Sequence, residues 1–171
     1  MSVICDFITG QELTDTDDER IRQGIERFLV EEKGYSKEDV EVDKEFEISI
    51  DGEVNRSKVD IIVCVEEKRF MIIRCARGSL VSREREVISC ARTFDVYQIP
   101  FAIVTNGEDA EVLDTVTGEV ISCGLGAIPS KREALEAIKR IEFKRLPKER
   151  IEKEKRIFLA FDAIKCPLKC D

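Results

Sequence analysis

Two neighbouring apolar segments and one carboxylate form the part of this sequence whose residue types and spacing could support chemistry. Asp60 lies at the start of the apolar run Val59–Val65, and a second apolar run, Phe70–Ala76, follows the polar turn Glu66–Lys68. Metal-dependent phosphodiester hydrolysis needs two or three oxygen ligands for Mg²⁺ and a lysine or second metal that polarises water. A hairpin can supply these groups with an aspartate on one strand and Glu-x-Lys on the next, because residues i and i+2 share a face.

The composition narrows the chemistry further. The sequence contains no histidine, which excludes His-based nucleophile triads, His-ligated zinc and His general acid–base catalysis. Any hydrolytic mechanism must therefore rely on carboxylates, lysines or a metal. The 36 acidic and 28 basic residues give a formal net charge of -8. This acidity disfavours nonspecific nucleic-acid binding over the whole surface, but it leaves room for a local basic face.

A local excess of basic residues lies between residues 56 and 92. This segment holds nine basic and five acidic residues, and we expect its cations to be able to bind the phosphates of DNA. The candidate nucleic-acid contacts are Lys58, Arg74, Arg77 and Arg83. The alternative is a solvated face, because the alternating charges of residues 83–86 could neutralise each other.

The hydrophobic pattern predicts helices on both sides of a group of strands. Capping oxygens at Asp15–Asp18 begin a helix that runs to about Glu32, and Gly34 is placed to terminate it. The other predicted elements are a half-exposed strand Val42–Ile50 ending at the turn Asp51–Gly52, buried strands Val59–Val65, Phe70–Ala76 and Pro100–Thr105, a helix Ser82–Phe94, a short edge strand Glu111–Asp114, and helical segments from Ser130 that are interrupted at Pro147 and resume to about Ile164.

This order of elements predicts an α/β fold with a mixed sheet flanked by helices. We expect a core over residues 1–125 and a C-terminal helical extension over residues 126–171 that packs on it. The start of the sequence has no signal-peptide pattern, and no apolar stretch is long enough for a membrane helix, so we expect a cytoplasmic protein without a membrane partner. The sequence contains no P-loop and hence no ATP-driven motor.

Three segments resemble a known family. GYSKEDVEVDKEFEI, SKVDIIVCVEEKRFMIIRCARG and IPFAIVTNGEDAEVLDTVTG are similar to the N-terminal nuclease domain of type I restriction enzyme R subunits, in the PD-(D/E)xK superfamily. The C-terminal helices look like those of small archaeal stand-alone members. The resemblance implies a restriction-endonuclease-like fold, a three-layer α/β/α arrangement around a central mixed sheet.

The resemblance also implies which residues occupy the family's catalytic positions. The aspartate corresponds to Asp60, the glutamate position holds Arg74, the lysine position holds Ala76, and a Q-x-x-x-Y motif falls on Glu86 and Cys90. Arginine cannot ligate Mg²⁺, and its charge repels the metal. We therefore predict a catalytically degenerate nuclease fold that is not an enzyme, needs no cofactor and binds DNA or a protein partner, including a second copy of the chain.

Two alternatives stay open at this point. In the first, an active DNA endonuclease with a relocated site uses Mg²⁺ or Mn²⁺ held by Asp60 together with Glu86, Glu84, or Glu19 or Glu26 of the first helix. In the second, the chain is a protein-interaction scaffold. For Asp60 itself, the alternative to a metal ligand is a strand-end carboxylate paired with the nearby Arg74.

The Cys-Pro-x-x-Cys tail is the remaining motif. Cys166 and Cys170 resemble half of a zinc knuckle, and a closed zinc site requires four ligands. Cys5 or Cys123 could complete such a site, or two chains could share the metal. A disulfide and unlinked thiols are the alternatives; the odd number of cysteines and the lack of a secretion signal favour reduced thiols.

Overall fold

A six-stranded mixed sheet forms the centre of the fold. The computed structural model describes residues 2–165, with side chains up to residue 161. The strands lie across the sheet in chain order: β3 (Val40–Ile50), β4 (Glu53–Val65), β5 (Lys68–Cys75), β6 (Phe101–Thr105), β7 (Ala110–Asp114) and β8 (Val120–Cys123). Only the β5–β6 pair is parallel among these neighbours. A parallel pair needs a long crossover connection, and here it contains the helix α2 (Glu84–Thr93).

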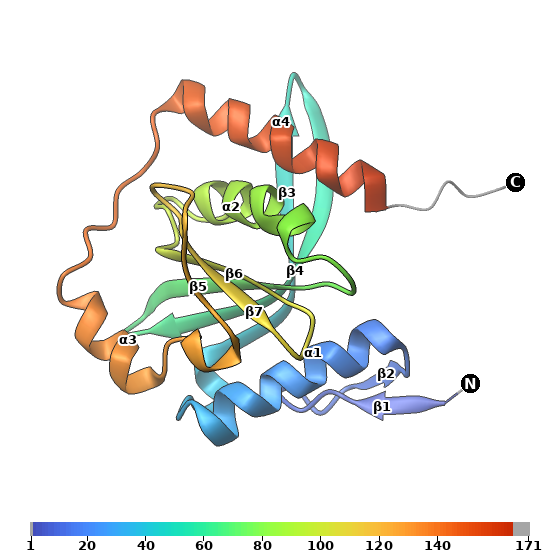
Figure 1. The fold of residues 1–171 in the computed structure, drawn as a ribbon. Coiled ribbons are helices and arrows are strands. Elements are labelled where there is room, and N and C mark those ends of the chain that lie inside the picture. The colour runs from blue at the N-terminus through green and yellow to red at the C-terminus, as the bar shows by residue number, and fades with distance from the viewer. Residues whose placement is uncertain (1, 166–171) are drawn as a thin grey trace, which may run out of the picture.

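Helices cover both faces of the sheet (Figure 1). On one side lies α1 (Asp17–Arg27), continued by a π-helical turn over Phe28–Glu32, together with α3 (Lys131–Ile138). On the other side lies α2, and α4 (Lys148–Lys165) packs on α2. The predicted three-layer α/β/α arrangement with a central mixed sheet is therefore confirmed.

The β4–β5 hairpin is buried on both faces because its two faces pack against different helices. Ile61 and Ile73 face each other in register and contribute to the core beneath α1. Ile62 and Ile72 form the next pair and contribute to the core beneath α2. This alternation explains the nearly continuous apolar runs in the sequence, since strands covered on both faces have no solvent-facing positions.

Several local predictions are confirmed. Thr16 caps α1 by accepting a hydrogen bond from the Glu19 backbone N–H. Gly34 follows the helical segment with a φ of 81°, the left-handed conformation that favours glycine at a helix end. The turn between β3 and β4 places Asp51 and Gly52 at φ values of 50° and 80°, as expected for a two-residue hairpin loop.

Other predictions were wrong. The strand around Glu111–Asp114 is not an edge strand, because β8 pairs with it on the far side. The short β8 exposes Val120 and Ile121 and therefore gives little hydrophobic signal. The helix that begins after Ser130 ends at Ile138 rather than near Pro147. The following segment, residues 139–147, runs without helix along the core, where Gln98 N donates a hydrogen bond to Lys144 O.

One element was not predicted. A two-stranded sheet of β1 (Val3–Cys5) and β2 (Glu12–Thr14) lies before α1. Each strand has only three residues, too few for an alternating pattern to be recognised. None of the helices in the described part of the chain combines the length and apolar character needed to cross a membrane.

Candidate functional site

A cleft of about 410 Å³ lies where β4 and β5 meet the first turn of α1 and the turn that precedes α2. The hairpin contributes Asp60 and Arg74, and the chain that leaves β5 contributes Ala76 and Arg77. The first turn of α1 adds Asp18, and Arg83 lies opposite, just before α2; Cys75 completes the lining. The fold thus brings together Asp60, Arg74 and Ala76, three of the positions that the resemblance marked as catalytic, whereas the other two, Glu86 and Cys90, do not line this cleft.

Arg74 is held between two carboxylates in this cleft. Its Nε lies 3.6 Å from Asp60 Oδ2 and 3.1 Å from Glu86 Oε1. Its Nη1 donates a hydrogen bond to Lys58 O at 3.0 Å, which fixes the direction of the guanidinium. Glu86 is almost fully buried on α2 and is also paired with Arg83 at 3.3 Å. Arg74 therefore occupies the space toward which Asp60 and Glu86 both point.

Asp60 is held by the backbone as well as by arginine. Its Oδ2 accepts a hydrogen bond from the Cys75 backbone N–H at 2.9 Å. Burial raises the pKa of Asp60 above its ordinary value, and the opposing effects of Arg74, this hydrogen bond and Arg22 do not cancel it. Burial likewise raises the pKa of the Cys75 thiol well above its ordinary value, so this cysteine is a poor nucleophile.

The other cations predicted to bind nucleic acid are each paired with an acid. Lys58 Nζ lies 3.3 Å from Asp43 Oδ2. Arg77 bridges to the first turn of α1, where its Nε lies 2.9 Å from Asp18 Oδ1 and its Nη1 lies 3.5 Å from Asp17 Oδ2. Near the start of α2, where acidic and basic residues alternate, Arg83 is paired with Glu86. The local excess of basic residues is thus largely compensated by acids from β3, α1 and α2.

Glu19 and Glu26, the first-helix acids predicted as metal ligands, do not line the cleft. Glu19 Oε2 accepts hydrogen bonds from Arg22, the shorter of them 2.7 Å long. Glu26 is 0% exposed, lies 3.9 Å from Arg22 Nη1 and belongs to a buried polar group with Asp6 and Gln23. Burial and the neighbouring Asp6 carboxylate raise the pKa of Glu26 to about 8. Sequence reasoning missed Arg22 and Asp6, and it named Glu19 and Glu26 as the candidate acids of α1, whereas Asp18 is the α1 acid that lines the cleft.

The predicted zinc ligands are only partly described. Cys166 and Cys170 lie outside the described residues. Cys5 and Cys123 are exposed free thiols, and Cys90 is buried in α2. Among the side chains that the structure describes, residues 2–161, no three or more cysteines and acids are grouped so that they could hold a metal ion.

One comparison with known proteins gives a match. The model of the family described as "Type I restriction enzyme R protein N terminus (HSDR_N)" matches residues 17–129, from α1 to the chain just after β8. The match thus covers well over half of the chain and includes the whole cleft. No curated protein and no solved structure matches the chain.

Proposed function

The chain belongs to the family of type I restriction enzyme R protein N-terminal regions, and we propose that it retains the nuclease fold of that family without cleaving phosphodiesters. In this proposal the cleft at the ends of β4 and β5 is a degenerate active site. The observation that carries it is the position of Arg74 between Asp60 and Glu86.

The residues of the cleft do not fit a divalent cation. Mg²⁺ requires an octahedron of oxygen ligands about 2.0–2.1 Å away, and the guanidinium of Arg74 already lies against both carboxylates. Arginine stays protonated in proteins and offers only donors, so it cannot become a ligand. Its charge also opposes the entry of a second cation between the two acids.

The position of the family's catalytic lysine supports the same proposal. Ala76 lines the cleft where the resemblance places a lysine. A methyl group can neither polarise a water molecule nor stabilise the developing charge on a phosphate. Lys58, on the neighbouring strand, does not take the place of this lysine, because its side chain is paired with Asp43 and does not line the cleft. Its backbone carbonyl accepts a hydrogen bond from Arg74 instead.

A cleavage assay tests this proposal. The full chain and its Asp60→Ala variant are incubated with supercoiled and linear DNA in the presence of Mg²⁺ or Mn²⁺. We expect neither protein to nick or linearise the substrates. Cleavage by the unmodified chain that disappears in Asp60→Ala would contradict the proposal and would support the alternative of an active site relocated to Glu86.

Rebuilding the motif gives a sharper version of the test. The double variant R74E and A76K restores the Asp…Glu-x-Lys arrangement on the hairpin. We expect Mn²⁺ titration by calorimetry to give binding in the rebuilt protein and none at millimolar concentration in the unmodified chain. Adding D60A to the rebuilt protein should abolish that binding. Equal Mn²⁺ affinity in the unmodified and rebuilt chains would mean that Arg74 does not exclude the metal.

A second candidate function is phosphate binding without cleavage. Lys58 and Arg77 have side chains that are 59% and 63% exposed, and ion pairs this exposed contribute about 0–1 kcal/mol. Nucleic-acid phosphates can therefore replace the acids that pair with them at little cost. This candidate accounts for the basic residues that the first proposal leaves without a role.

Fluorescence anisotropy with a labelled DNA duplex distinguishes these two functions. If the basic residues in and beside the cleft bind phosphates, Lys58→Ala and Arg77→Ala weaken binding and each lowers the salt dependence by about one unit of slope. Arg56→Ala is the matched control, because Arg56 is 70% exposed and also pairs with acids on β3, but it lies further along β4 from the cleft residue Asp60 than Lys58 does. No binding at low salt, or equal losses in all three variants, would leave the protein-interaction scaffold as the better account.

A further inference from the structure

A second pocket, of about 280 Å³, lies at the other end of α2. We call it the strap pocket, because the segment 139–147 closes one of its sides. Its remaining walls come from the end of α2 with the loop after it, residues 92–97, and from the first turns of α4. The cleft and the strap pocket are separated by the length of α2, about 15 Å for its ten residues.

Some of the cationic side chains that line the strap pocket are paired with acids, and others are not. Arg92 donates to Glu154 Oε1 and Thr115 O, both at 2.8 Å, and the Asp95 carboxylate is paired with Arg69 at 3.0 Å. Arg145 and Lys155 also line the pocket. Among the described residues, neither of these two has an acid within ion-pair distance.

The charge of the strap pocket is therefore decided by Arg145 and Lys155. The C-terminal end of α2 and the N-terminal end of α4 both lie beside it, and their dipoles place opposite partial charges there. These contributions offset each other. Two unpaired cations in a chain with a formal net charge of -8 leave a local site for an anion.

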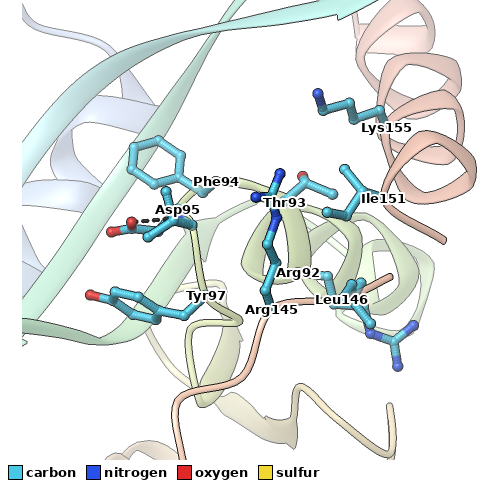
Figure 2. A pocket seen from close by; sticks show the side chains of 10 residues that line it. Arg92, Thr93, Phe94, Asp95, Tyr97, Arg145, Leu146, Ile151 and Lys155 are labelled. Carbon is cyan, nitrogen blue, oxygen red and sulfur yellow. Dashed lines mark hydrogen bonds between the residues drawn. The ribbon is translucent and has the colours of Figure 1, made fainter. Parts of the chain in front are cut away.

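Apolar and aromatic groups form the rest of the pocket. Figure 2 shows Phe94, Asp95 and Tyr97 on one side and Ile151 and Lys155 on the other. Val96 is 72% exposed at the same place, so an apolar side chain is available for contact with a ligand. An unpaired positive charge beside aromatic and aliphatic surface matches a ligand that has an anionic end and a flat ring.

We propose that the strap pocket binds a small phosphorylated molecule with a flat ring, of the nucleoside monophosphate class. The phosphate is held by Arg145 and Lys155, and the ring packs beside Tyr97 and Val96. The volume of about 280 Å³ lies just below the usual range for ligand pockets, about 300–1,000 Å³, which favours a mononucleotide over a larger dinucleotide.

This site is separate from the proposed nuclease-fold function. Residues 92–97 lie inside the segment matched by the family, whereas Arg145 and Lys155 lie beyond its end at residue 129. The pocket is therefore formed jointly by the family domain and the C-terminal segment of this chain. A bound ligand would connect the two and stabilise the folded chain by an amount that rises with the logarithm of the ligand concentration above Kd.

Calorimetric titration of the full chain with AMP tests the proposal. We expect saturable binding that Arg145→Ala and Lys155→Ala each weaken about tenfold, because each removes a charge-assisted contact to the phosphate. Lys153→Ala is the matched control, since Lys153 is on α4 two residues from Lys155 and points to a different side of the helix. Asp60→Ala should bind AMP like the unmodified chain, which separates this test from that of the cleft.

Two further ligands test whether both the phosphate and the ring of AMP contribute to binding. Inorganic phosphate and adenosine should each bind at least tenfold more weakly than AMP. Inorganic phosphate that binds as tightly as AMP would overturn the role of the ring. Absence of AMP binding at millimolar concentration, or binding that Arg145→Ala and Lys155→Ala leave unchanged, would overturn the site itself.

Discussion

Glu26 illustrates how a single buried carboxyl can make the stability of this chain depend on pH. Its side chain is 0% exposed, and its neighbours are Asp6 and Arg22. Burial and the Asp6 charge raise its pKa from 4.5 to about 8. Glu26 is therefore protonated at neutral pH in the folded chain and ionised in the unfolded chain.

The sign of the resulting pH dependence follows from linkage. Between pH 4.5 and 8 the folded state holds one proton more than the unfolded state at this residue, so the free energy of unfolding falls as the pH rises. The contribution is fully present below about pH 4.5 and disappears above about pH 8. Its slope is at most about 1.4 kcal/mol per pH unit.

We predict that Glu26→Gln removes this slope. The amide keeps the shape of the protonated carboxyl and does not titrate. Urea unfolding at several values from pH 5 to pH 8 should give similar stabilities for the two proteins at pH 5 and a growing advantage for Glu26→Gln toward pH 8. Glu31→Gln serves as the control, because Glu31 is an exposed residue of the turn that follows α1. Parallel curves for Glu26→Gln and the unmodified chain would refute the prediction.

At the scale of elements, α4 is attached to the core by one buried acid. Glu154 accepts hydrogen bonds from Arg85, Ser89 and Arg92, all on α2, at 2.8–2.9 Å. Burial alone would raise the pKa of Glu154, but these hydrogen bonds hold it at about 2. Phe158, one turn further along α4, is fully buried in the core beneath α2. Charge and apolar packing therefore act on the same face of α4.

We predict that Glu154→Gln destabilises the chain by about 3 kcal/mol at pH 7, because it leaves Arg92 buried without its charged partner. Denaturant unfolding measures this loss, and Glu152→Gln, an exposed change on the same helix, should have little effect. The folded-state pKa is lowered, so the contribution of Glu154 is present above pH 4.5 and is lost as the pH falls toward 2. The two proteins should accordingly converge in acid, and a constant difference down to pH 2 would contradict this account.

The elements differ in how well the sequence predicts them. The β4–β5 hairpin was predictable, because both strands are apolar on two faces and end in a polar turn, and the position of Asp60 beside Arg74 follows from it. The segment 139–147 was not predictable, because the spacing of Ile141 and Phe143 resembles that of core residues in a helix. In the structure Ile141 packs against the core beneath α1 and Phe143 packs on Tyr97, without a helix. The ion pairs of Arg22 and Glu154 were also inaccessible, since they join residues whose proximity depends on tertiary packing.

At the scale of the whole molecule, two apolar cores share one sheet. Tyr35 lies in the core beneath α1, where its hydroxyl donates a hydrogen bond to Pro129 O. Tyr97 packs at the margin of the core beneath α2 and accepts a hydrogen bond from Arg69 N. Ile61 and Ile62 are successive residues of β4 that belong to different cores. Loss of β4 would therefore disrupt both.

We predict that the two cores unfold together. The sequence has two tyrosines and no tryptophan, so Tyr35→Phe and Tyr97→Phe each leave a single fluorescent reporter on one side of the sheet. Within each variant, the urea midpoint from tyrosine fluorescence should coincide with that from far-UV circular dichroism. A midpoint that differs between the two probes would indicate that one layer unfolds before the other.

The guanidinium of Arg74 is a positive charge that the cleft cannot lose by exchange with solvent. A metal ion between two acids is exchangeable, and its occupancy follows the supply of that ion and the presence of chelators. Arg74 is covalently part of β5, so the charge between Asp60 and Glu86 is present in every copy of the chain from the moment it folds. We therefore predict that the architecture of the cleft is independent of the supply of metal ions and that a chelator such as EDTA leaves the thermal stability of the chain unchanged.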